Sequence, residues 1–233
     1  MLKNTRINLG IIRVIATALS ELNERVVYVG GAVVSLYIND PAAEDVRPTK
    51  DIDISLKIAS IGELEEIRES LAMKGFKQSP SDDVICRFRY KDIKVDVMST
   101  KAVGWAPANP WFGPGFKHLE KIDIEDKSIN ILQLSYFLAT KFSAFKDRGG
   151  NDARLSHDYE DITYILDNRI DLVEEIQKSP NDVKEYLKTE FKKLIESKNM
   201  KEAMMANLYY ETQEKRFNMI IEKLNKIVDD ERI

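Results

Sequence analysis

The segment that most constrains the fold is a short apolar run that ends at two glycines. Residues 26–29 read Val-Val-Tyr-Val, and Gly30 and Gly31 follow directly. A run of this length and composition predicts a buried strand, and the glycines predict a tight turn after it. Apolar residues recur at helical spacing over residues 7–24, and residues 32–37 suit a short helix. The chain therefore begins with helix, strand and helix in alternation.

The alternation continues to about residue 126, and helical patterns then take over. Loops are predicted where proline, glycine and aspartate gather, and residues 101–118 form a loop whose aromatic residues could pack on the core or stack on a base. The predicted strands are 51–57, 84–90 and 93–98, the last two forming a hairpin. Helices are predicted over 61–74, from an N-cap at Ser128 onward, and over about 156–167, 181–197 and 200–229.

This order predicts an α+β (α/β) fold with two domains. Residues 1–126 would form an α/β domain with a small mixed sheet, and residues 127–233 a helical C-terminal domain. We interpret residues 39–48, which hold two prolines and two aspartates, as an insertion in the loop before the strand at 51–57.

Composition excludes several classes of protein. The chain is 43% hydrophobic and 32% charged, which is ordinary for a globular protein. Its net charge of −4 gives no global field for nucleic acid. With one cysteine, Cys86, and two histidines, neither an internal disulfide nor a structural zinc site is expected. We expect a cytoplasmic protein without a signal peptide or membrane span, in which Cys86 is a packed residue.

Three aspartates suggest a metal site. Asp51 and Asp53 are two residues apart on a predicted strand, so their carboxylates face the same side, about 6.6 Å apart. Asp96 lies between Val95 and Val97 on another candidate strand. A carboxylate on a mostly buried strand is costly unless it is paired or bound to metal. The three suit Mg²⁺, and two ions are expected; the alternative is a solvated acidic face.

Two further groups of residues are open to either a binding or a structural interpretation. Gly30 and Gly31 allow a phosphate to approach the backbone at a helix start, although paired glycines are common in turns. In the helical half, Lys141 and Arg148 share a helix face, and Asp158 and Asp161 follow on the next helix. The two cations could bind nucleotide phosphates, or they could pair with the two aspartates and brace the helices.

Taken together, these residues resemble the DNA polymerase-β nucleotidyltransferase superfamily, and more narrowly the AbiEii/AbiGii nucleotidyltransferase toxins. The resemblance covers residues 30–162. It is carried by four motifs: Gly30-Gly31 with Thr49-Lys50-Asp51-Ile52-Asp53, then Ile93-Lys94-Val95-Asp96-Val97, then Lys141 with Ala144 and Arg148, and then Asp158-Tyr159-Glu160-Asp161-Ile162. One departure is the gap of nineteen residues between Gly31 and Asp51, which the predicted insertion at 39–48 would explain.

The resemblance implies a polymerase-β-like domain and a Mg²⁺-dependent transfer of NMP from an NTP to an acceptor. Asp51, Asp53 and Asp96 would hold metal, and Asp96 would also deprotonate the acceptor hydroxyl. The implied catalytic residues from the helical domain are Lys141 and Asp161. The implied nucleotide-binding residues are Gly30, Gly31, Ser35, Thr49, Arg148 and Asp158.

The acceptor and the partners stay open at this point. The resemblance implies tRNA as an acceptor and a cognate antitoxin as a protein partner. A small molecule or a protein side chain is the alternative acceptor. A non-catalytic nucleotide-binding module is an alternative of another class, but the three aspartates argue against it. Lysines and glutamates interleave along the C-terminal helices, which is more typical of a solvated face than of an RNA-binding patch.

Overall fold

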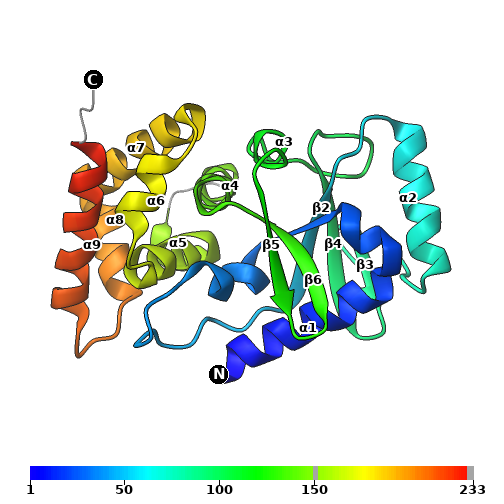
Figure 1. Cartoon of the computed structure of the whole chain (residues 1–233), viewed down its shortest axis with the longest axis horizontal. Helices are drawn as coiled ribbons and strands as arrows, with labels where there is room; N and C mark the ends of the chain where they lie inside the picture. Colours follow the sequence, from blue (N-terminus) through cyan, green and yellow to red (C-terminus); the bar gives the residue numbers. More distant parts are fainter. Residues whose placement is uncertain (149–151, 230–233) are drawn as a thin grey trace. The chain divides into compact units, whose positions relative to one another are not determined.

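The computed structural model describes residues 1–148 and 152–229 (Figure 1). The chain divides into two compact units. The N-terminal unit comprises Met1–Ser35 and Glu44–Gln133, and the C-terminal unit comprises Leu36–Ala43 and Leu134–Ile233. Each unit is described by itself below.

A six-stranded mixed sheet forms the centre of the N-terminal unit. Its order is β3-β4-β2-β1-β6-β5, with β2 parallel to β4, β1 parallel to β6, and the other neighbours antiparallel. The predicted α+β fold with a mixed sheet is thereby confirmed. The strands are β1 (Val26–Val29), β2 (Asp51–Leu56), β3 (Arg87–Tyr90), β4 (Ile93–Ser99), β5 (Leu119–Ile124) and β6 (Lys127–Leu132).

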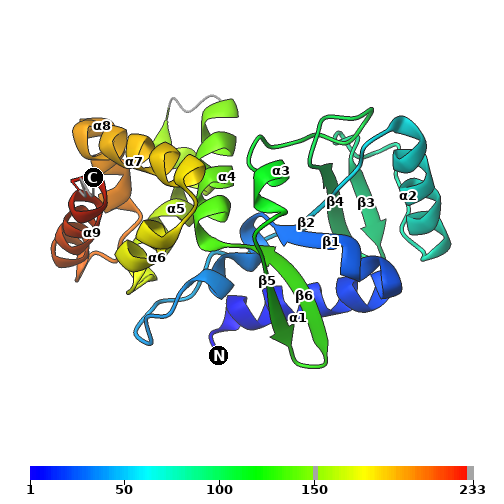
Figure 2. The same cartoon turned by 45° about the horizontal axis from the view of Figure 1, so that its top comes forward.

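Helices accompany the sheet where apolar spacing predicted them. Figures 1 and 2 show α1 running along β6 and α2 beside the β3 side of the sheet. Turns of 3-10 helix follow α1 and β1. The elements are α1 (Lys3–Leu19), η1 (Ser20–Arg25), η2 (Gly31–Tyr37), α2 (Ile61–Met73) and α3 (Phe112–Gly115), the last within the predicted aromatic loop.

The first helix is capped by a residue from far along the chain. Leu2 at its N-cap has no side-chain acceptor to offer. Instead, the carboxylate of Asp45 accepts hydrogen bonds from the backbone N–H groups of Asn4, at 2.6 Å, and Thr5, at 3.0 Å. These are two of the N–H groups that every helix leaves without an internal partner in its first turn. The bonds attach residues 44–46 of the predicted insertion to α1.

The prediction that residues 127–133 begin the helical domain is wrong. Residues 127–132 are strand β6, which pairs antiparallel with β5, and α4 begins only at Leu134. The physical reason is visible in the alternation of Ser128, Ile129, Asn130 and Ile131, since β-branched residues at every second position favour a strand. Ile129 and Ile131 are buried.

The C-terminal unit is a bundle in which α4 packs against α5 and α7, and α9 against α7 and α6. The single helix predicted over 200–229 is in fact two, because α8 ends where the N–H of Asn207 bonds back to Ala203 and Met204. Within the described residues no helix is both long and apolar enough to cross a membrane. The helices are α4 (Leu134–Asp147), η3 (Ala153–Leu155), α5 (His157–Asn168), α6 (Leu172–Lys178), α7 (Asn181–Glu196), α8 (Lys198–Ala206) and α9 (Gln213–Val228).

The segment Leu36–Ala43 belongs to this bundle although it lies early in the sequence. Asp40 accepts bonds from the guanidinium of Arg216 on α9 at 3.2 Å, and Arg216 also donates to Asp167 at 2.6 Å. The N–H groups of residues 39 and 40 both donate to the carbonyl of Asn168. The predicted insertion is therefore anchored at both ends, residues 39–43 in one unit and residues 44–46 in the other.

Candidate functional site

The turn after β1 lies against the first metal-candidate strand. In the antiparallel pairing of β1 with β2, Val29 is opposite Asp53, so Gly30 comes beside the Asp53 carboxylate. Gly30 has a φ of +72°, and a Cβ at this position would overlap Asp53 Oδ2. Both facts require glycine, because other residues are strained at this φ and none has room. The predicted association of the glycine turn with Asp53 is thus present in the structure.

The three predicted metal ligands share one face of the sheet. Asp51 and Asp53 alternate with buried Ile52 and Ile54 on β2. The parallel register of β2 with β4 places Asp53 opposite Asp96. Register partners point to the same face of a sheet, so the carboxylates lie on one side, above the core that the intervening residues fill. The spacing argument from the sequence predicted the shared side of Asp51 and Asp53, and the register adds Asp96 to it.

An arginine that the sequence argument missed joins two of these carboxylates. Arg87, the first residue of β3, is opposite Asp96 in the hairpin. Its Nε donates to Asp96 Oδ1 at 2.7 Å, and its Nη2 donates to Asp96 Oδ2 at 2.6 Å and to Asp51 Oδ2 at 3.1 Å. The hydrogen bonds to Asp96 are the main cause that raises the pKa of Arg87 above its usual value. Arg87 therefore neutralises part of the acidic cluster.

The donor chemistry of the cluster fits a divalent cation. Mg²⁺ prefers carboxylate oxygens and takes one or two of them, with its remaining positions free for water and phosphate. Asp51 and Asp96 share a single guanidinium, so this pair of carboxylates keeps an excess of negative charge. Within residues 1–148 and 152–229, however, no three acidic, histidine or cysteine side chains are already gathered into a metal-binding group. Both oxygens of Asp96 are bonded to Arg87 instead.

Of the predicted nucleotide-binding residues, Thr49 lies beside Gly31. A Cβ at Gly31 would overlap the guanidinium of Arg47, a cation that the sequence argument did not select. The Thr49 methyl group is the next neighbour, and the Thr49 hydroxyl donates to Asn8 on α1 at 3.1 Å. Ser35 Oγ is buried and has no hydrogen-bond partner among the described residues. A guanidinium against a glycine backbone suits an anionic group.

In the C-terminal unit, the predicted cations are paired with the predicted aspartates. Lys141 on α4 is only 5% exposed, and its Nζ lies 2.7 Å from Asp161 Oδ2 and 3.3 Å from Asp158 Oδ1 on α5. Arg148 Nη1 donates to Asp158 Oδ2 at 2.6 Å. Asp158 and Asp161 are 4% and 2% exposed. The bracing interpretation of these residues is therefore what the geometry of this unit shows.

Because the charged groups of this cluster are buried, their ion pairs matter for folding. A buried carboxylate is costly unless it is paired, and Ser156 caps α5 immediately before the two aspartates. Arg148 differs from Lys141 in that its side chain is 73% exposed. A role for Lys141, Asp158, Asp161 and Arg148 in binding nucleotide or in catalysis remains a prediction from the resemblance alone.

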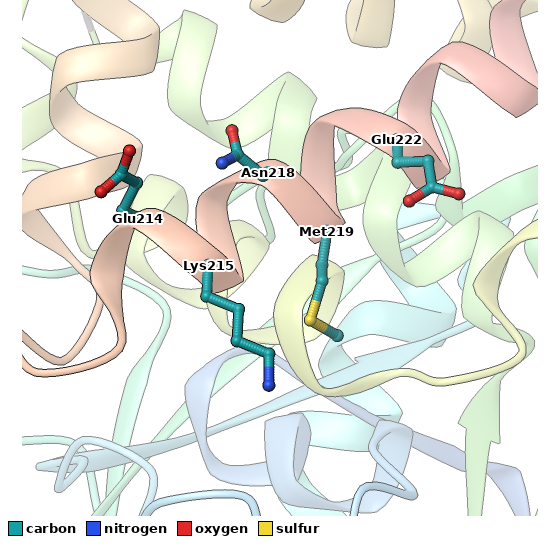
Figure 3. A pocket seen from close by; sticks show the side chains of 5 residues that line it. All are labelled: Glu214, Lys215, Asn218, Met219 and Glu222. Carbon is teal, nitrogen blue, oxygen red and sulfur yellow. The ribbon is translucent and has the colours of Figure 1, made fainter.

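Two surface pockets lie outside the carboxylate cluster itself. A pocket of about 350 Å³ is formed by residues 78–85 together with Arg87, and so adjoins the cluster. The other, of about 470 Å³, lies along α9 (Figure 3) and contains none of the predicted site residues. Its lining residues are Glu214, Lys215, Asn218, Met219 and Glu222.

Cys86 is buried, as predicted, and burial raises the pKa of its thiol to about 11. It is therefore protonated at neutral pH and unsuited to act as a nucleophile.

The family of this chain follows from comparison with known proteins. No curated protein matches the chain. The chain is similar to an antigenic nucleotidyltransferase-like protein from Paracoccidioides brasiliensis, at 16% identity and a TM-score of 0.47, over 85% of this chain and 92% of that one. The model of the family described as nucleotidyl transferase AbiEii toxin, type IV TA system, matches residues 13–232. The chain therefore belongs to the AbiEii family of toxin nucleotidyltransferases, which confirms the resemblance and the assignment as an enzyme.

Proposed function

We propose that this nucleotidyltransferase transfers NMP from an NTP to a tRNA acceptor in a Mg²⁺-dependent reaction. The observation that carries the proposal is the shared face of Asp51, Asp53 and Asp96, with Gly30 directly beside Asp53. Three carboxylates at the edge of a glycine turn are suited to a triphosphate that arrives with its metal. Family membership supports nucleotidyl transfer in general; the metal and the acceptor are the proposed part.

The site residues of the N-terminal unit would each have a distinct role. Asp51, Asp53 and Asp96 would hold Mg²⁺, which supplies charge neutralisation and orients the phosphates when it is bound. Gly30 and Gly31 would let the triphosphate approach the backbone. The Ser35 hydroxyl would gain the hydrogen-bond partner that it lacks, and Thr49 would line the same turn.

The chemistry then requires a base and a leaving group. Asp96, as the carboxylate on the neighbouring strand, would accept the proton of the acceptor hydroxyl. The acceptor oxygen forms a bond to the α-phosphorus, and the bond from that phosphorus to the bridging oxygen of pyrophosphate breaks. Reactions of this type depend mainly on positioning and on compensation of the developing charge, which three fixed carboxylates and a glycine turn can provide.

The choice of tRNA, and of an antitoxin as a partner, rests on the family rather than on a surface of this chain. The family is that of the toxins of type IV toxin-antitoxin systems. Lysines on the C-terminal helices are paired with glutamates at short spacing, as Lys192 is with Glu196 and Lys198 with Glu202. Such pairs describe a solvated mixed face. A small molecule or a protein side chain is therefore the alternative acceptor, and the same experiment tests it.

The test incubates the full chain with each labelled NTP, MgCl₂ and total tRNA. The expected result is label on tRNA with one or two of the four NTPs, and a loss of roughly 100-fold or more in Asp53→Asn. Asp53→Asn is chosen because asparagine keeps the shape beside Gly30 and removes the charge. Label on protein or on small molecules alone would transfer the assignment to the alternative acceptor.

A matched control separates the cluster from general loss of acidic charge. Asp92 lies in the turn between β3 and β4, is exposed, and is not part of the cluster. Asp92→Asn should retain full activity. Absence of label with every NTP, together with no Mg²⁺-dependent NTP binding by calorimetry, would refute the catalytic proposal. Mg²⁺-dependent NTP binding without label on any acceptor would favour a non-catalytic nucleotide-binding module.

A further inference from the structure

Arg87 occupies the oxygens that a metal would need. It forms a bidentate pair with Asp96 through Nε and Nη2, at 2.7 and 2.6 Å, and the same Nη2 reaches Asp51 at 3.1 Å. Bidentate guanidinium–carboxylate pairs are among the stronger charge-assisted hydrogen bonds in proteins. Both Asp96 oxygens accept a hydrogen bond from Arg87, so the guanidinium competes with a cation for the charge and lone pairs of this carboxylate.

The position of Arg87 in the fold makes this pairing a built feature of the sheet. The two-residue turn at Lys91 and Asp92 fixes the hairpin register, which sets Arg87 opposite Asp96. The side chains of Arg87 and Asp96 are 14% and 13% exposed, so solvent screens the pair only weakly. Without Arg87, the Asp51 and Asp96 carboxylates would lose the guanidinium that joins them.

Arg87 also borders a pocket that offers its side chain a second position. It lines the pocket of about 350 Å³ formed with residues 78–85. Asp82 in that pocket is already held by Arg89, through bonds of 2.8 and 2.6 Å. Asp83, which is exposed, also lines this pocket. A rotation of the Arg87 side chain would therefore keep its charge near an acid while it releases Asp96 and Asp51.

We propose that Arg87 is the internal counter-ion of the metal site: it holds Asp96 and Asp51 in the metal-free protein and leaves them when a divalent cation binds. This inference rests on the proposed metal-dependent function. Arg87 is a positioning residue in this scheme, since it keeps two ligands oriented and their repulsion low. As a consequence, a higher concentration of divalent cation is needed to fill the site when no nucleotide is bound.

The experiment measures Mn²⁺ binding to the full chain by electron paramagnetic resonance, without nucleotide. Arg87→Ala should bind Mn²⁺ about tenfold or more tightly than the unmodified chain, because the competitor is gone and the site is more negative. Arg87→Lys should fall between the two, since an ammonium cannot make the bidentate pair. In thermal unfolding, Mn²⁺ should raise the midpoint of Arg87→Ala by more than that of the unmodified chain.

Arg89 provides the matched control. It lies two residues further along β3 and is paired with Asp82 rather than with the metal-candidate carboxylates. Arg89→Ala should leave the Mn²⁺ affinity unchanged within about twofold. If Arg87→Ala fails to fold, Arg87→Gln takes its place, because glutamine keeps much of the stem and removes the charge.

The outcomes separate the two proposals. Mn²⁺ affinity that is unchanged or weaker in both Arg87→Ala and Arg87→Gln would overturn the counter-ion role while leaving the metal site in place. Equal tightening in Arg89→Ala would also overturn it, because the effect would then be one of net charge. Absence of Mn²⁺ binding in every variant, with NTP added as well, would instead refute the proposed metal-dependent function.

Discussion

Replacement of Lys141 by methionine should destabilise the C-terminal unit by about 3 kcal/mol. Removing one partner of a buried ion pair typically costs roughly 3–5 kcal/mol, because the remaining charge stays buried. Here the Lys141 ammonium lies 2.7 Å from Asp161 and 3.3 Å from Asp158. Asp158 keeps its bond of 2.6 Å to Arg148, so the lower end of that range applies. Methionine preserves most of the apolar stem and limits any cavity.

The assay is urea unfolding followed by circular dichroism at 222 nm, with hydrogen exchange to locate the effect. Exchange should accelerate in α4 and α5 and stay unchanged in β2 and β4 of the other unit. A loss below about 1 kcal/mol, the range of an exposed ion pair, would refute the reasoning. Arg148→Ala is the control: its side chain is 73% exposed, so about 0–1 kcal/mol is expected.

A second substitution separates bracing from chemistry. Lys141→Met combined with Asp161→Asn removes the charge of both partners, and the double variant should recover about 1–2 kcal/mol relative to Lys141→Met alone. If nucleotidyl transfer returns with stability, Lys141 acts through folding. If stability returns and activity does not, Lys141 also acts on the phosphates, as the family resemblance implies.

Three other predictions follow from local geometry. Gly30→Ala should cost about 1–2 kcal/mol from its left-handed φ alone and should displace Asp53, so transfer should fall more than stability in parallel activity and unfolding assays. In Asp45, partial burial would raise the pKa, but the hydrogen bonds from the start of α1 outweigh it and lower the pKa. Asp45→Asn should therefore cost about 1 kcal/mol at pH 7. The stabilisation is complete above the ordinary carboxyl pKa and is lost as the pH falls through the lowered pKa of Asp45, so the difference in unfolding free energy should shrink as the pH falls below about 4. Arg216→Ala should cost about 2 kcal/mol and increase hydrogen exchange over residues 36–43, since it removes charged bonds to Asp40 and Asp167; unchanged exchange there would contradict the anchoring role.

The parts of the fold that the sequence predicted are those with strong local patterns. The strand at 26–29, the glycine turn, the strand at 51–56 and the hairpin at 87–99 all have periodicity or turn residues that specify them. The shared face of Asp51 and Asp53 needed only alternation along one strand. That β2 and β4 are direct neighbours with Asp53 opposite Asp96 is a long-range pairing, which no local pattern specifies.

What the sequence did not predict depends on contacts between distant residues. Asp45 caps α1 across forty-one positions, and Arg216 holds Asp40 across 176. A cap of this kind leaves no signature near the helix, where Leu2 reads as a poor N-cap. The boundary at 127 was misplaced for a different reason: a strand of six residues with Ile at alternate positions was read as the start of a helix.

Arg87 was not predicted as a site residue, although the sequence contains a signal for its position. A hairpin with Lys91 and Asp92 as its two-residue turn pairs residues whose numbers sum to a constant, so Tyr90 with Ile93 implies Arg87 with Asp96. A cation at the register position opposite a candidate metal ligand predicts an ion pair with that ligand. The same register that groups the carboxylates also supplies their counter-ion, so a metal site inferred from acids alone is incomplete. The affinity of such a site depends on the cation that the protein must first displace.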